Sequence, residues 1–221
     1  MNPPTYLSSA AAVQRLLGCL QGRPGRSLIG LAGPPGAGKS TLAKNWAAEV
    51  NAAVGPSTMV ALGMDGFHQT RKLLMARPDA AEALARRGAP WTFDPEALAA
   101  RLIRLREAKG TEPVPWPDFE HAVGDPVENA IWVPAVARIV LVEGLYLLHP
   151  ADGWDAVNSQ FDEVWYLDTP LEVALERLTL RHMAAWNLSR EQAEARVAAN
   201  DRLNAEMVAT GRDRAQILIR D

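Results

Sequence analysis

Five short runs of apolar residues alternate with longer stretches of helical periodicity along this chain. These runs are the expected strands, and they cover Ser27 to Ala32, Thr58 to Met64, Ile139 to Val142, Val164 to Leu167 and Ala215 to Ile219. Short uninterrupted apolar runs are typical of strands that are buried on both faces of a parallel sheet. Because helical patterns lie between the runs, we predict a three-layer α/β/α fold around a five-stranded parallel sheet.

Helix boundaries are marked by capping residues at several positions. Apolar residues from Tyr6 to Leu20 recur at helical spacing and predict a packed amphipathic helix before the first strand. Asp94-Pro95-Glu96 has the order of an N-cap, a first helical residue and an acidic first turn. Thr169 to Glu172 and Ser189 to Gln192 each have the pattern of a capping box, the first with proline at the first helical position. We therefore expect two helices that are separated by a short break from Met183 to Leu188.

We expect one domain over residues 1–221, since this length fits a single α/β domain with an excursion or a lid. The stretch from Gln69 to Val133 is longer than a simple crossover between parallel strands requires. It contains two helical patterns and then a proline- and aromatic-rich segment from Pro113 to Phe119. We interpret residues 69–133 as an inserted substrate-binding section of the same domain.

Charge and cysteine content exclude several classes of protein. The net charge is −3 and the isoelectric point is about 5.9, so we expect no general attraction to nucleic acid or to an anionic membrane. Cys19 is the only cysteine, which leaves no internal disulfide and no cysteine metal cluster. No stretch approaches the ~20 apolar residues of a membrane span, and the N-terminus lacks the pattern of a signal peptide. These features predict a cytoplasmic protein without membrane insertion.

Residues 33–41 have the glycine-rich pattern of a phosphate-binding loop. Gly33, Gly38, Lys39 and Ser40 complete the motif G-x-x-x-x-G-K-[ST], between an expected strand and an expected helix. Glycines let successive backbone N–H groups turn toward a phosphate, and the following helix adds its partial positive charge. We expect the whole segment to hold the phosphates of a nucleoside triphosphate. It consists of Gly33, Pro34, Pro35, Gly36, Ala37, Gly38, Lys39, Ser40 and Thr41. Lys39 would contact the β- and γ-phosphates, and the Ser40 hydroxyl would bind Mg²⁺.

Two acidic residues follow expected strands and are expected at the same edge of the sheet, where ligands of parallel sheets bind. Glu143 follows the strand that begins at Ile139 and is expected to bind Mg²⁺ together with Ser40, directly or through water. Asp65 follows the second strand and could orient an acceptor hydroxyl and take its proton, but an Asp-Gly pair is also a common turn. Gly66 would let the chain approach the ligand. His68 could touch a substrate, although an ordinary loop histidine fits its position equally well.

Arg177 and Arg181 lie four residues apart and therefore share one face of the expected helix. Kinases need a mobile segment that covers the phosphates, and the planar guanidinium of arginine binds phosphate oxygens in pairs. We interpret residues 177–192 as a lid in which Arg181, and less strongly Arg177, assists catalysis. A solvated helix face remains the alternative. Asn200 and Asn204 share a face of the next helix and could contact the nucleotide or brace the lid.

The glycine loop, Asp65-Gly66-Phe67, Val142-Glu143-Gly144 and the arginine pair occur in the order found in the phosphoribulokinase, uridine kinase and pantothenate kinase family. The chain resembles this family of P-loop kinases from about Ser27 to Val208, and most closely its bacterial members known as nucleoside/nucleotide kinase-like proteins or fructose transport system kinases. The stretch from Arg87 to Asp94 is similar to a segment of the pantothenate-kinase-like branch. The resemblance implies a P-loop NTPase sheet with a lid, ATP and Mg²⁺ as cofactors, and Asp65 as the catalytic base.

Candidate substrate-binding residues follow from the same motifs. They are Asp65, Phe67, His68, Phe119 and His121. Uridine kinases carry a tyrosine-aspartate-phenylalanine stretch followed by histidine and arginine, which contacts the nucleoside. Here Pro117 replaces the tyrosine and Val123 stands where the arginine would be, so the resemblance to nucleoside-binding members is partial. A sugar or sugar-like acceptor fits the fructose-linked relatives better.

These features lead to several functional hypotheses. The first is an ATP-dependent kinase that phosphorylates a hydroxyl of a small metabolite, most simply a sugar or a sugar-like compound. Nucleoside and pantothenate kinases are the alternatives within this class, and a nucleoside monophosphate kinase is a further one. A nucleotide-dependent regulator linked to a transporter is the alternative of another class. A homodimer is compatible with every one of these hypotheses.

Overall fold

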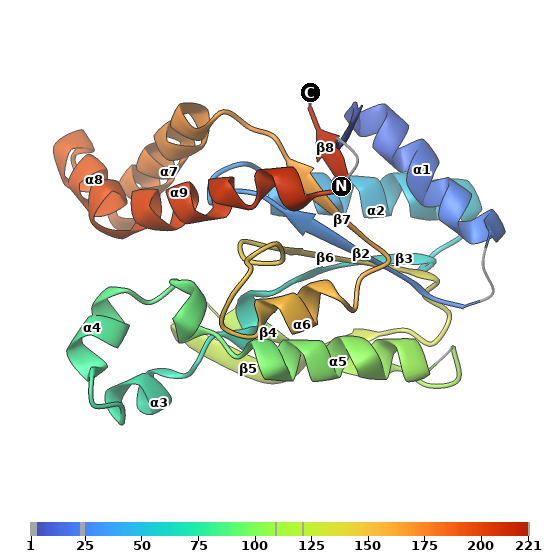
Figure 1. Ribbon diagram of the computed structural model, residues 1–221, viewed down its shortest axis with the longest axis horizontal. Coiled ribbons are helices and arrows are strands. Elements are labelled where there is room, and N and C mark those ends of the chain that lie inside the picture. The colour runs from blue at the N-terminus through green and yellow to red at the C-terminus, as the bar shows by residue number, and fades with distance from the viewer. Residues whose placement is uncertain (1–3, 23–24, 109, 121, 221) are drawn as a thin grey trace.

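The fold is built around one parallel sheet in a computed structural model that describes residues 4–22, 25–108, 110–120 and 122–220. Its strand order is β1-β8-β7-β2-β6-β3 (Figure 1). The strands are β1 (Thr5–Leu7), β2 (Ser27–Ala32), β3 (Met59–Gly63), β6 (Ile139–Gly144), β7 (Glu163–Leu167) and β8 (Ile217–Ile219). All five predicted strands belong to this sheet. The predicted number of five is wrong, because β1 adds a sixth strand at the edge.

Strand β1 also corrects the prediction that the N-terminal helix includes Tyr6. Thr5 to Leu7 pair in parallel with β8, and α1 (Ser9–Gly22) begins after them. The Ser8 hydroxyl accepts a hydrogen bond from the backbone N–H of Ala11 at 3.3 Å, which satisfies a donor that a helix start leaves free. The helical spacing of apolar residues therefore extends back to Tyr6, past the true start of the helix, which follows Ser8.

Helices cover both faces of the sheet and make the predicted three layers. On one face, α1 and α2 (Lys39–Val54) bury Leu16 and Trp46 against the β2 residue Ile29. On the other face, α5 (Pro95–Glu107) and α6 (Trp154–Asn158) bury Leu102 and Trp154 in a second core, which lies below the sheet in Figure 1. Buried large apolar side chains on both faces explain why the strands read as continuous apolar runs.

The segment predicted as an insertion contains α3 (Arg71–Met75), α4 (Ala80–Ala85), α5 and an antiparallel pair, β4 (Val114–Glu120) and β5 (Asp125–Val133). The helix start at Asp94 is confirmed, because its carboxylate accepts a hydrogen bond from Ala97 N at 2.9 Å. The proline- and aromatic-rich stretch forms β4. Trp116 of this strand donates from Nε1 to Gly63 O at 2.9 Å, which attaches the hairpin to the edge of the main sheet at β3.

The segment after β7 forms α7 (Leu171–Trp186), α8 (Arg190–Arg196), a π-helical turn η3 (Val197–Asp201) and α9 (Arg202–Thr210). The capping box at Ser189 is confirmed. The one at Thr169 is wrong, since Pro170 is the N-cap and the Thr169 hydroxyl donates to Ala37 O at 3.2 Å instead. The break is also shorter than predicted, because α7 continues to Trp186.

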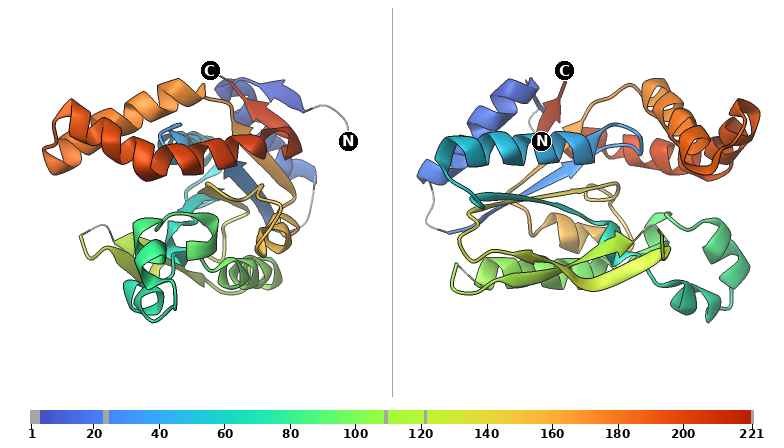
Figure 2. Two further views of the ribbon diagram at one scale, coloured as in Figure 1. Left: turned by 60° about the vertical axis from the view of Figure 1, so that its left-hand side comes forward. Right: turned by 180° about the vertical axis from the view of Figure 1, so that it is seen from behind.

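Helices α7 to α9 extend beyond the sheet on the same side as α3 and α4, as the two further views also show (Figure 2). The P-loop, the end of β3 and the end of β6 lie between these two groups. In the described part of the chain, no helix is both long enough and apolar enough to span a membrane.

Candidate active site

The loop between β2 and α2 has the backbone that a phosphate cradle requires. Gly36 and Gly38 have φ of +80° and +101°, a region that residues with a side chain rarely adopt. A Cβ atom on Gly36 would also lie 2.2 Å from the carbonyl oxygen of Ala174 in α7. Glycine at position 36 is therefore required both by the turn and by the close packing of α7 on the loop.

Lys39 begins α2 underneath this loop and is only 6% exposed. Its Nζ donates to Gly33 O at 2.9 Å and to Pro34 O at 3.0 Å. Burial lowers the pKa of the ammonium, while the nearby carboxylates Glu143 and Asp65 favour its charged form. The Lys39 ammonium group therefore lies near Glu143 and Asp65, the two acidic residues that the sequence predicts in the site.

Ser40 and Glu143 meet at the carboxyl ends of the central strands. The Ser40 hydroxyl donates to Glu143 Oε1 at 2.7 Å. Glu143 stands in β6 between β2 and β3, and burial raises the pKa of its carboxyl. Mg²⁺ is commonly held by one or two protein oxygens together with phosphate oxygens, which fits this pair. Within the described ranges, no group of three or more His, Cys, Asp or Glu side chains is arranged to hold a metal ion.

Asp65 begins a 3₁₀ turn, η1 (Asp65–Phe67), directly after β3. Its backbone carbonyl accepts from His68 N at 3.2 Å and lies 2.8 Å from His68 Nδ1. A Cβ on Gly66 would lie 2.2 Å from the carbonyl oxygen of Pro117. Gly66 therefore makes room for the close approach of strand β4.

Two arginines of α7, Arg177 and Arg181, lie beside the P-loop. Arg177 Nη1 donates to Ala37 O at 3.1 Å. Arg181 lies one helical turn further along the same face and is close enough to Lys39 to contribute to the lowered pKa of that amine. Both guanidinium groups thus add positive charge beside the loop.

A cavity of about 450 Å³ brings most of the predicted site residues together. Predicted residues that line it are Pro35, Gly36, Gly38, Lys39, Ser40, Thr41, Asp65, His68, Glu143, Arg177 and Arg181. The lining does not include Gly33, Pro34 and Ala37, whose carbonyl groups instead accept hydrogen bonds from Lys39 and Arg177.

Two predicted substrate-binding residues, Phe67 and Phe119, are not part of the cavity lining. Phe67 is buried in the core, with its ring 5.0 Å from that of Trp116, and is not part of the cavity lining. Phe119 lies behind His68, with ring centroids 4.8 Å apart. His121 lies outside the described residues.

The cavity wall also contains residues to which the sequence assigned no role. They are Arg87, Gly88, Phe93, Gly144 and Leu145. Of these, Arg87, Gly88 and Phe93 belong to the stretch from Arg87 to Asp94, for which the sequence shows only a family resemblance. Asn200 and Asn204, whose shared helix face suggested a contact with the nucleotide or the lid, line the cavity together with Asp201.

A second cavity of about 610 Å³ adjoins the first on the other side of the P-loop. Gly38, Thr41 and Arg177 line both cavities. The second one is also bounded by residues that follow β7 and by the end of β8, including Thr169, Pro170 and Ile219. The P-loop therefore lies between two neighbouring cavities at the carboxyl edge of the sheet.

Comparison with known proteins decides the family. The model of the Phosphoribulokinase / Uridine kinase family matches residues 28–220. The chain belongs to this family. It is a P-loop kinase, that is, a phosphotransferase with a hydroxyl group as acceptor, and membership implies use of ATP, typically with Mg²⁺.

Individual relatives agree with this assignment. The kinase is 38% identical over 184 residues to a Schizosaccharomyces pombe protein named as a candidate uridine kinase, which covers 83% of this chain and 78% of the relative. It is 36% identical over 152 residues to an ATP-dependent kinase-like protein of Aspergillus versicolor, covering 67% of this chain and 88% of the relative. The crystal structure of a candidate fructose transport system kinase from Silicibacter sp. TM1040 superimposes with a TM-score of 0.85 at 33% identity, covering 96% of this chain and 98% of that one.

Proposed function

We propose that this kinase transfers the γ-phosphate of ATP to a hydroxyl group of a small uncharged metabolite, a sugar or a sugar-like polyol. The observation that carries the proposal is that Lys39, the Ser40–Glu143 pair, Asp65 and Arg181 all line one cavity. This cavity combines a cradle for phosphate, oxygen ligands for Mg²⁺ and a carboxylate that can receive a proton.

In the proposed reaction, the acceptor oxygen forms a bond to the γ-phosphorus, the bond to the bridging oxygen breaks, and ADP leaves. Lys39 and the backbone of the P-loop hold the phosphates, and Arg181 and Arg177 add positive charge where negative charge is transferred. Asp65 orients the acceptor hydroxyl and takes its proton. Ser40 and Glu143 would hold Mg²⁺, which when bound neutralises phosphate charge.

The adjoining cavity supports a place for the nucleoside part of ATP. Because it shares Gly38, Thr41 and Arg177 with the first cavity, a nucleotide whose phosphates cross the P-loop can extend into it. We therefore assign the nucleotide base to the second cavity and the acceptor to the part of the first cavity near Asp65 and Arg87.

The charges near that acceptor region favour a neutral compound. Arg87 is paired with Asp125 at 2.5 Å, and Asp201 is paired with His182 at 2.6 Å. Amide groups of Asn200 and Asn204 and the ring of Phe93 complete the wall, and such groups suit hydroxyls and the apolar face of a sugar ring.

A nucleoside acceptor is less well supported. Pro117, which replaces the family's tyrosine, is buried beneath Gly66, and Val123 is 61% exposed at the position of the family's arginine. Neither residue lines the cavity. The name of the Silicibacter relative supports a sugar-linked role, while that of the Schizosaccharomyces pombe relative keeps uridine among the acceptors to be tested.

The decisive experiment measures ADP formation with Mg·ATP and a panel of D-fructose, D-ribose, uridine, pantothenate and UMP. We expect a sugar or polyol to stimulate turnover, and Asp65→Asn to lower kcat by about 10²- to 10⁴-fold while binding of a non-hydrolysable ATP analogue persists. Asp155→Asn is the matched control, because Asp155 is exposed and lies outside the cavity lining. Normal turnover by Asp65→Asn would refute its role as base, and ATP hydrolysis that no acceptor changes would favour a regulator instead.

A further inference from the structure

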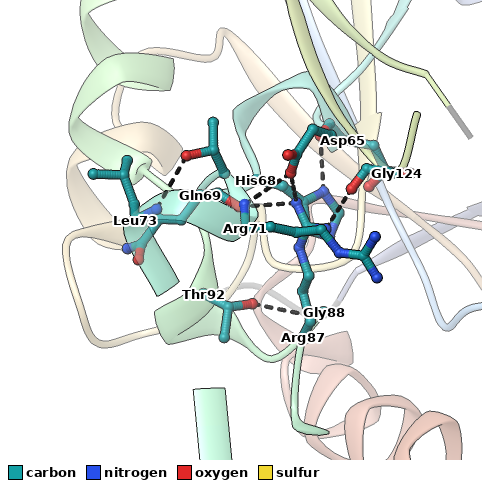
Figure 3. A network of polar contacts seen from close by, with 11 residues as sticks. Asp65, His68, Gln69, Arg71, Leu73, Arg87, Gly88, Thr92 and Gly124 are labelled. Atoms are coloured by element: carbon teal, nitrogen blue, oxygen red, sulfur yellow. Dashed lines mark hydrogen bonds and ion pairs between the residues drawn. The ribbon is translucent and has the colours of Figure 1, made fainter. Parts of the chain in front are cut away.

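Arg87 joins three segments of the acceptor side of the cavity through one guanidinium group. Nη2 donates to Gln69 O at 3.0 Å and to Asp125 Oδ1 at 2.5 Å, and Nη1 donates to Gly124 O. Asp125 Oδ1 also accepts from Arg71 N at 2.8 Å. Figure 3 shows Arg87 among Gln69, Arg71 and Gly124, with Asp65 and His68 at the same junction. The loop after α4, the segment after η1 and the turn of the β4–β5 hairpin are thereby tied together.

The segment held by Arg87 is the direct continuation of the turn that carries Asp65. His68 bonds back to Asp65 O, and Gln69 is fixed from its other side by Gln69 N to Thr92 O at 2.9 Å. The Arg87 bond to Gln69 O closes this frame. A displacement of Arg87 would therefore move the chain that positions the Asp65 carboxylate.

The same residue also contacts the segment from α7 to α9, which includes the predicted lid of residues 177–192 and is called the α7–α9 lid below. Asn200 in the π-helical turn η3 donates from Nδ2 to the backbone carbonyl of Arg87 at 3.1 Å, and Arg86 Nη2 donates to Asn204 Oδ1 at 3.1 Å. Next to Asn200, Asp201 bonds to His182 of α7 at 2.6 Å, and His182 follows Arg181 directly. A continuous series of contacts thus leads from the helix that carries Arg177 and Arg181 to the turn with Asp65.

The contact between lid and loop is incompletely paired. Arg86 Nη1, Arg87 Nε and Asn200 Oδ1 are buried and have no hydrogen-bond partner among the residues that the structure describes. Two of these atoms are donors and one is an acceptor, so a slightly closer approach of η3 would let Asn200 Oδ1 accept from an arginine. Single π-helical turns frequently occur at functional sites, where a small change of helical register moves such side chains.

We propose that Arg87 is a positioning residue that couples closure of the α7–α9 lid, through Asn200, to the orientation of the Asp65 turn. The proposal rests on the function proposed above, since it assigns Asp65 to the acceptor. Arg87 does not touch the reacting atoms in this scheme. When the α7–α9 lid closes, Arg87 fixes the position of the Asp65 turn on the acceptor side of the cavity. Asp65 is then aligned with the acceptor hydroxyl while Arg177 and Arg181 cover the phosphates.

The first test measures amide hydrogen exchange of residues 65–71 in the presence of Mg²⁺ and a non-hydrolysable ATP analogue. Asn200→Ala removes a group from the lid that touches neither Asp65 nor Gln69, and we expect exchange in residues 65–71 to become about tenfold faster. Arg77→Lys is the matched control, because Arg77 pairs with Asp79 at 2.8 Å in the same insertion and is not part of the cavity lining. Unchanged exchange in Asn200→Ala would overturn the coupling.

The second test uses the best acceptor of the panel and Arg87→Lys, which keeps the charge but not the fork of donors. We expect KM for the acceptor to rise and kcat to fall, each by about tenfold, while KM for Mg·ATP stays within about twofold. Equal changes in both KM values, or kinetics like those of Arg77→Lys, would overturn the proposal. If Arg87→Lys does not fold, Asn200→Ala decides. If no compound is phosphorylated, the exchange experiment still tests the coupling, and only the proposed function fails.

Discussion

Replacing Gly36 by alanine should damage this fold far more than its single extra methyl group suggests. Two costs add at this position. The residue has φ +80°, where a side chain costs about 1–2 kcal/mol. The new Cβ would also lie 2.2 Å from Ala174 O and 2.9 Å from Leu178 Cγ, and forcing atoms into a packed site costs about 1–3 kcal/mol. We therefore expect the free energy of unfolding to fall by about 2–5 kcal/mol.

Two further glycines serve as references for the backbone cost and the packing cost. Gly38 has φ +101°, but its nearest neighbour to a Cβ would be Arg177 Nη1 at 3.8 Å, so Gly38→Ala should show the backbone cost alone. Gly18 lies within α1 with nothing inside 4 Å, and Gly18→Ala should raise the free energy of unfolding by about 0.5–1 kcal/mol.

Urea denaturation of the nucleotide-free protein measures all three variants. For a chain of this size, the expected loss in Gly36→Ala corresponds to a Tm lower by roughly 5–15 °C. A Gly36→Ala protein that is as stable as Gly38→Ala would refute the reasoning, because the close approach of α7 to the loop would then contribute nothing.

Two other predictions follow from buried charged groups. Burial raises the pKa of Glu143, so protons compete with Mg²⁺ at a higher pH than for a free glutamate. Affinity for the Mg²⁺ complex of an ATP analogue should fall as pH falls through the raised pKa, and calorimetric titration should show this dependence lost in Glu143→Gln. Arg26 is buried and donates to the carbonyl groups of Leu105, Pro134, Ala135 and Ala137, so Arg26→Met should lower the free energy of unfolding by about 2–4 kcal/mol. The partly exposed Arg104→Met is the control for urea denaturation, and equal losses would contradict the assignment.

Local patterns were sufficient for five of the six strands of the sheet and for the backbone of the P-loop. These five strands contribute apolar residues to the cores on both faces, so they appear in the sequence as apolar runs, and the glycine motif specifies its own backbone. Strand β1 was missed because its three residues are partly exposed and owe their conformation to pairing with β8, more than 200 residues away. Only the tertiary structure could reveal that partner.

The acceptor side of the site was predicted less completely for a similar reason. Asp65 and Glu143 follow strands and could be placed by the rule for parallel sheets. Arg87 has partners in three distant segments, and Phe67 points into the core because Trp116 of the hairpin packs on it. No pattern near either residue encodes those neighbours.

The pairing of β1 with β8 also has a consequence for how this protein is made. During synthesis, residues 5–7 leave the ribosome more than 200 residues before residues 217–219, their partners in β8. Strand β1 therefore cannot take its place at the edge of the sheet until β8 has been made. While the intervening strands are synthesised, the nascent chain carries β1 without its partner, and unpaired strands of this kind are prone to aggregate.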